Sequence, residues 1–163
     1  MKKRYGVLVV AVLALAGGAL AGAAVALADQ PPAGTFVAVL SAEEEVPLCN
    51  PATNASRGLA IFQVTDEATG TVEFEIVTNN VPGDIVAAHI HFAPKGVAGP
   101  VVQPTPPTPG EENGVVAEGS FANPGLLAAI RANPDNYYVN VHTNVCPAGV
   151  VRGQLGDHGP GNN

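Results

Sequence analysis

The sequence predicts an all-β domain, either an antiparallel β-sandwich or a Greek-key barrel, with about seven or eight strands and one short helix. Apolar and polar residues alternate with a period of two in several short segments, and clusters of Pro, Gly, Asn and Asp separate these segments. One segment, after the Asn-Pro pair at residues 123–124, has the features of a helix start.

The first half of the domain carries the clearest strand signals. Residues 35–41 are rich in β-branched and aromatic side chains, and residues 57–65 are apolar on both faces, which is typical of a central strand. Residues 71–77 alternate cleanly, with apolar side chains on one face and Glu73 and Glu75 on a solvated face. A short turn separates the last two segments, so we expect them to pair as a hairpin.

Three consecutive glutamates, Glu43, Glu44 and Glu45, follow the first expected strand. A run this short is not an acidic tail, and we expect it to form a solvated loop. The rim of a cation-binding site is the alternative interpretation.

The second half alternates strands with a long loop and a helix. Pro and Gly dominate residues 94–114, and the Pro-rich stretch at 104–110 cannot form a helix or a central strand, so we expect a long exposed loop. Asn123 suits the N-cap of a helix and Pro124 its first position, so a short helix should end near Ala132. The remaining strands are expected at residues 85–92, 114–121, 137–143 and 150–155.

The N-terminus has the composition of a secretory signal peptide. Basic residues at positions 2–4 precede an uninterrupted apolar and small run over residues 6–27, and an Ala-x-Ala pattern predicts cleavage after Ala28. An uncleaved anchor is the alternative, because the run is long enough to cross a bilayer. The predicted parts are a signal peptide at 1–28, a linker at 29–34, the β-domain at 35–155 and a disordered tail at 156–163.

The charge balance excludes two classes of partner. Three of the seven Lys and Arg residues lie in the leader, which leaves four against 14 acidic residues, a formal charge of −10. Nucleic acid and anionic lipid bind through Lys and Arg contacts, so we expect neither, and no membrane contact beyond the leader. The expected location is extracytoplasmic: secreted, periplasmic or at the cell surface.

The chain has two cysteines, Cys49 and Cys146, both beyond the leader. An even number of cysteines in an exported chain predicts a disulfide, and only one pairing is available. The bond would close nearly the whole domain into a loop and stabilise it by roughly 4 kcal/mol.

Three of the four histidines share one pattern. His89 and His91 are two apart on an expected strand, so they project from the same face, and His142 occupies an equivalent outward position on a later strand. If these strands are neighbours, the three imidazoles meet and could bind copper or zinc. Ring nitrogens within about 4–5 Å of each other would make a shared ion feasible. The alternative is that the histidines are surface groups hydrogen-bonded to nearby loops.

Five motifs together resemble the CHRD domain, a module repeated in chordin and also found singly in exported bacterial proteins. They are LSAEEEVP (40–47), AHIH (88–91), GVAGPVV (96–102), YVNVHT (138–143) and VVRGQL (150–155), in the order typical of the family. The resemblance covers nearly the whole chain after the leader. It implies an extracellular binding role and no defined catalytic activity. The Pro-rich insert at 103–110 looks longer than the usual turn of the family.

A looser resemblance is to copper–zinc superoxide dismutase, on the basis of the His-x-His strand, the Gly-rich loop after it, the disulfide and the later histidine. The loop at 92–114 contains no His or Asp, so the zinc half of such a site is missing.

These observations predict an exported CHRD-type binding or adhesion module without catalytic activity, whose partner is an unknown extracellular protein or a metal ion. The alternative is an extracytoplasmic copper- or zinc-binding protein that uses His89, His91 and His142. Dismutase-like activity is a third hypothesis.

Overall fold

The computed structural model of the protein describes residues 34–108 and 110–156, and every structural statement below concerns these residues. The predicted signal peptide at 1–28, all but the last residue of the predicted linker, and the predicted tail after Gly156 lie outside them. Within the described ranges, no helix has both the length and the apolar character needed to cross a membrane.

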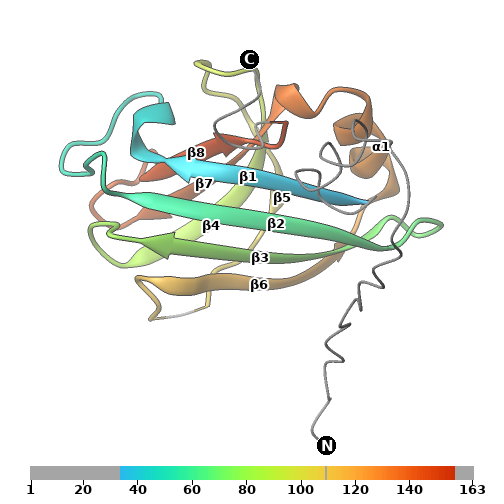
Figure 1. Cartoon of the computed structure of the whole chain (residues 1–163), viewed down its shortest axis with the longest axis horizontal. Helices are drawn as coiled ribbons and strands as arrows, with labels where there is room; N and C mark the ends of the chain where they lie inside the picture. The colour runs from blue at the N-terminus through green and yellow to red at the C-terminus, as the bar shows by residue number, and fades with distance from the viewer. Residues whose placement is uncertain (1–33, 109, 157–163) are drawn as a thin grey trace, which may run out of the picture. The chain divides into compact units, whose positions relative to one another are not determined.

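Eight strands form one sheet in which every neighbouring pair is antiparallel (Figure 1). The order across the sheet is β5-β4-β7-β8-β1-β2-β3-β6. The all-β fold class is therefore confirmed. The strands are β1 (Thr35–Ser41), β2 (Arg57–Asp66), β3 (Thr71–Asn79), β4 (Ile85–Phe92), β5 (Val101–Pro104), β6 (Gly114–Ala122), β7 (Tyr137–Thr143) and β8 (Val151–Gln154). The helices are α1 (Pro124–Ala132) and the short 3-10 turns η1 (Ala42–Glu44) and η2 (Pro134–Asn136).

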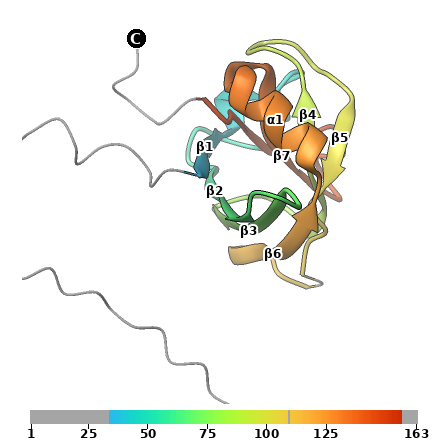
Figure 2. The same ribbon diagram turned by 90° about the vertical axis from the view of Figure 1, so that its right-hand side faces the viewer.

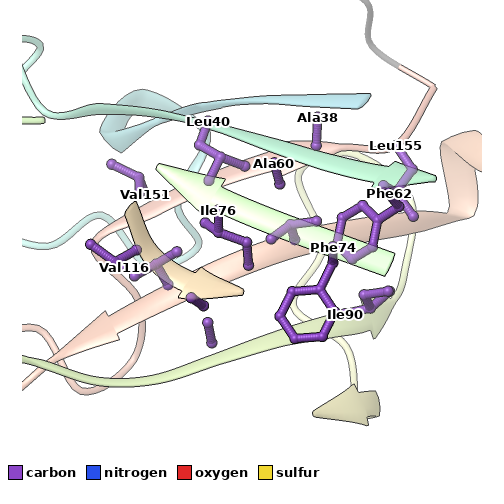
Figure 3. Close-up of a cluster of buried hydrophobic side chains, with 14 of the residues drawn as sticks. Ala38, Leu40, Ala60, Phe62, Phe74, Ile76, Ile90, Val116, Val151 and Leu155 are labelled. Carbon is purple, nitrogen blue, oxygen red and sulfur yellow. The ribbon is translucent and has the colours of Figure 1, made fainter. Parts of the chain in front are cut away.

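The sheet curls so that its two ends face each other, as Figure 2 shows. Side chains at alternate positions fill the interior, where Phe62, Phe74 and Ile90 approach one another from β2, β3 and β4 (Figure 3). The ring centroids of Phe62 and Phe74 are 6.2 Å apart. Burying this apolar surface is the main source of stability in a chain with few aromatic residues.

The helix α1 closes one end of the interior, and its start is as predicted. The side chain of Asn123 accepts a hydrogen bond from the backbone N–H of Leu126 at 3.0 Å, which satisfies one of the free donors of the first turn. Leu127 and Ile130 on its buried side line a small apolar cavity together with Phe62 and Ile90.

The predicted loop at 94–114 contains a strand that the sequence interpretation missed. Val101–Pro104 forms β5, which pairs only with β4 and is an edge of the sheet. Pro is tolerated on an edge strand because its missing N–H faces away from the ladder. The opposite edge, β6, approaches this region through a hydrogen bond at 2.8 Å from the backbone N–H of Thr108 to the carbonyl of Val116.

The outward-facing side of the sheet has two halves, and they differ in how far loops cover them. Over β4, β7 and β8 the loops at 93–99 and 144–150 cover polar side chains, and we call this the covered half. Over β1, β2, β3 and β6 the outward side chains are exposed or partly exposed, and we call this the open half. The covered half buries His91, Tyr138, Asn140, Arg152 and Gln154, each of which is at most 7% exposed.

Candidate metal centre

The three histidines of the predicted site meet on the covered half of the sheet. His89 and His91 lie on β4, and His142 lies on the neighbouring strand β7. Each ring offers a ligand nitrogen, and these nitrogens lie within 4.8 Å of one another. The separation falls within the range expected of histidines that could share an ion.

Period-two alternation and strand register produce this meeting. Ala88 and Ile90 on β4 point into the core, so His89 and His91 point outward. In the ladder between β4 and β7, His89 faces Asn140 and Ala87 faces His142. His142 is therefore diagonal to His89 on the same face, within reach of its ring.

The closest contact joins Nδ1 of His89 to Nε2 of His142, at 3.3 Å. Two nitrogens bound at about 2.0–2.1 Å to one tetrahedral ion are about 3.3 Å apart, so this pair already has the spacing of two ligands. The widest ligand separation, 4.8 Å, would have to shorten by about 1.5 Å around an ion, a movement that two rings can share.

Backbone carbonyls fix the protonation of two rings. His91 directs Nδ1 at the carbonyl of Gly99 at 2.9 Å, and His142 directs Nδ1 at the carbonyl of Pro147 at 3.1 Å. A carbonyl can only accept, so each Nδ1 carries the proton and each Nε2 presents a lone pair. Metal-binding histidines are held in this way. Nε2 of His91 is buried and has no hydrogen-bond partner among the described residues.

Glycine is required where the first of these carbonyls approaches. A Cβ at Gly99 would collide with the backbone carbonyl oxygen of Phe92. The backbone N–H of Gly99 also donates to the hydroxyl of Tyr138 at 3.0 Å. Gly99 thus ties the loop at 93–99 to both His91 and Tyr138. Gly99 lies within the motif GVAGPVV at 96–102, and the Gly-Pro pair at 99–100 is the signal that could have shown its role.

Burial lowers the pKa of all three imidazoles. For His142 burial, helped by the neighbouring His89, lowers the pKa to about 4. The rings are consequently neutral at neutral pH, which is the form that binds a metal ion. His89 is partly exposed, so the cluster is not completely buried.

Tyr138 connects the cluster to a buried cation. Its ring stacks on His91, with centroids 4.8 Å apart and planes 14° apart, and the guanidinium carbon of Arg152 lies 3.5 Å from the centre of the same ring. Arg152 is 1% exposed and donates hydrogen bonds to Gln154 and to the carbonyl of Pro94. A stacked guanidinium keeps its charge with little water.

The prediction of a solvated acidic loop is wrong for Glu45. Glu43 and Glu44 belong to η1, but Glu45 is 3% exposed and accepts a hydrogen bond from the amide of Asn140 at 3.3 Å. Burial raises its pKa to about 8, against the opposing effect of the charge on Arg152. Three identical residues in a row gave no signal that the third turns inward.

The predicted disulfide is present and holds the second loop of the covered half. Cys49 and Cys146 are bonded with an S–S distance of 2.02 Å and Cα atoms 5.8 Å apart. Cys146 is followed directly by Pro147, whose carbonyl orients His142. The disulfide therefore anchors the segment that fixes one ring of the cluster. A bond of this kind is compatible with an oxidising, extracytoplasmic compartment.

The fold and the cluster define a disulfide-bonded, all-β domain that carries three converging histidines under its loops. The family model of the CHRD domain matches residues 36–155. The chain belongs to the CHRD domain family. Searches of curated proteins and of solved structures gave no match. Membership supports a non-catalytic binding module at the level of the family, which is not known for enzymatic activity.

Proposed function

We propose that the protein is an exported binding module that holds one copper or zinc ion through His89, His91 and His142. The observation that carries the proposal is the fixed orientation of His91 and His142. The Nδ1–H of each ring donates a hydrogen bond to a backbone carbonyl, which leaves the Nε2 lone pair free to bind an ion.

The ligand set favours copper(II) over zinc. Three neutral imidazoles without a thiolate suit both metals, and among divalent ions such sites bind copper(II) most tightly. Because the cluster has three ligands and His89 is partly exposed, the bound ion would keep one position for water or for a donor group of a partner. The described residues include neither a fourth histidine nor a carboxylate in the cluster, so we do not propose dismutase activity.

Calorimetric titration of the protein without its leader, with Cu(II) and with Zn(II), tests the proposal. Wild type should bind one ion, and His91→Ala and His142→Ala should each weaken binding by at least about 100-fold, because two ligands hold the ion far less well than three. His158→Ala is the matched control, since it removes the remaining histidine and should leave the affinity unchanged. Equal affinity in all four proteins would end the proposal.

Export rests on the predicted signal peptide and on the disulfide. The expected result is that expression of the full chain in a secreting host yields a mature protein that begins at Asp29, as N-terminal sequencing would show. Retention of the complete chain in the cytoplasm would contradict it.

A further inference from the structure

The open half of the sheet carries a continuous row of apolar side chains that faces outward. Strand pairing places Val39 opposite Leu59, Leu59 opposite Val77, and Val77 opposite Val115. We call these four residues the apolar rung. Val39 is 37% exposed and Val115 39% exposed, and the other two are partly exposed. An outward face of an antiparallel sheet is normally polar, so an apolar row across four strands is unusual.

The next row along the strands changes from apolar to acidic. Ile61, which is 36% exposed, stands opposite Glu75, and Glu75 stands opposite Glu118. Both glutamates are exposed. Like charges directly opposite each other destabilise a sheet, and the ion pairs among the described residues do not include either carboxylate.

The fold itself does not require the surface that these two rows form. On the covered half, loops bury five outward polar side chains, although Val86 on β4 stays exposed. On the open half, the described residues leave valines and paired carboxylates side by side in solvent. Neighbouring strands are about 4.8 Å apart, so the apolar rung spans about 14 Å, the length of a four- or five-residue extended segment.

We propose that the apolar rung, with Glu75 and Glu118 beside it, is a docking surface for a basic and apolar segment of a partner protein. Valine-sized side chains of the partner would cover the rung, and its Lys or Arg side chains would pair with the two carboxylates. The charge of the whole chain, −7, attracts such a segment from a distance.

Charge also argues against two other occupants. A second copy of this chain would bring a further acidic surface to Glu75 and Glu118, and like-charge contacts oppose association. An anionic membrane surface is repelled for the same reason. A basic partner is the occupant that relieves the repulsion between the two glutamates.

The test is an NMR titration of the isotopically labelled protein, without its leader and in EDTA, with a peptide of alternating Lys and Val residues. The expected result is saturable shifts of amides in β1, β2, β3 and β6 that weaken as salt increases. A Lys-Ser peptide lacks the apolar contacts and a Glu-Val peptide has the wrong charge, so both should bind much more weakly. EDTA removes any ion from the histidines, so the result is independent of the proposed metal site.

Two double variants separate the contributions. Val39→Thr with Val115→Thr keeps side-chain shape and should weaken peptide binding about fivefold or more, because the apolar contacts are lost. Glu75→Gln with Glu118→Gln should weaken it about threefold to tenfold, the effect of two exposed ion pairs, while the melting temperature rises. Val86→Thr on β4, where Val86 is 54% exposed, is the matched control and should change nothing.

Three results would overturn the proposal. The first is no binding of the Lys-Val peptide, or shifts confined to β4, β7 and their loops. The second is equal binding of the Lys-Ser peptide. The third is a dimer in sedimentation equilibrium that the Val39→Thr and Val115→Thr variant abolishes, since the occupant would then be a second copy.

Discussion

The covered and open halves of the sheet share one interior but have opposite outer faces. On β7 and β8 the outward positions are polar, yet Asn140 and Arg152 are almost completely buried beneath loops. On β1 and β6 the outward positions include Val39 and Val115, which remain exposed. Burial thus follows loop coverage and not the polarity of the side chain. The consequence is that polar side chains are buried in one half, and a row of apolar side chains stays partly exposed in the other.

The loops of the covered half supply hydrogen-bond acceptors for several of its buried polar groups. Carbonyl groups of Gly99 and Pro147 accept from His91 and His142, and Pro94 accepts from Arg152. A buried polar group without a hydrogen-bond partner would lower the free energy of unfolding. Within the described part of the chain, Nε2 of His91 has no hydrogen-bond partner, like Oε1 of Glu45 and Oδ1 of Asn140 nearby, and a bound ion would satisfy this nitrogen. The open half needs no such partners, since its glutamates are solvated.

The largest expected effect is loss of the disulfide that holds the covered half. Replacing both Cys49 and Cys146 by Ala should lower the free energy of unfolding by about 2–5 kcal/mol, because the bond joins residues 97 apart and restricts the unfolded chain. Urea denaturation with and without reductant measures this. Affinity for Cu(II) should fall as well, since the loop that carries Pro147 loses its anchor. A midpoint that reductant leaves unchanged would contradict the prediction.

Acid should destabilise the covered half through His142. Its pKa is about 4 in the folded protein and about 6.5 when unfolded, so the unfolded chain binds more protons between these values. Stability is therefore lost as the pH falls from 6.5 towards 4, by about 1–2 kcal/mol after allowing for the half-exposed ring.

The raised pKa of Glu45 acts in the opposite sense, because its stabilising effect is lost as the pH rises from 4.5 towards 8. The difference between wild type and His142→Gln isolates the histidine from this background. Parallel pH–stability curves for the two proteins would show that His142 does not titrate in this way.

Gly99→Ala should weaken metal binding about tenfold to 100-fold, the usual effect of disturbing the group that orients a ligand. The added Cβ meets the carbonyl oxygen of Phe92, so the backbone here must shift, and we expect the shift to disturb the hydrogen bond between the Gly99 carbonyl and His91. Gly125→Ala in α1 is the matched control, because a Cβ there contacts only the side chain of Asn123 at 3.9 Å. Equal affinity of both variants would argue that the carbonyl does not orient His91.

The smallest expected effect belongs to the open half. Glu75→Gln should raise the free energy of unfolding by about 0.2–1 kcal/mol, because it removes the repulsion with Glu118 across the strand pair. Glu73→Gln is the control, since Glu73 faces Gln63 and Ser120. If Glu73→Gln stabilises the protein as much as Glu75→Gln does, general charge reduction explains both.

The sequence was sufficient for the strands whose alternation is strong. The bounds of β1, β4 and β7 agree with those predicted, because alternate apolar side chains of each strand fill the interior. The helix was also predicted correctly, from the N-cap residue Asn123. By contrast β5 was missed, since four residues next to a Pro-rich stretch carry almost no pattern.

The candidate site was predictable only in part. Period-two spacing places His89 and His91 on one face, but their approach to His142 depends on β4 pairing with β7, which lies about 50 residues further along the chain. Coverage by loops is likewise set by tertiary contacts, so the burial of Glu45 and the role of the Gly99 carbonyl were not foreseen. Local patterns determine which face a side chain takes, and long-range packing decides what covers that face.

The position of a bound ion would show whether the three histidines form one metal site. Crystals grown with Zn(II) or Cu(II) and measured at the absorption edge of the metal should give one anomalous peak, about 2.0–2.1 Å from Nε2 of His91 and of His142 and from a ring nitrogen of His89. A peak at surface carboxylates alone, or none near these three rings at saturating metal, would contradict the account.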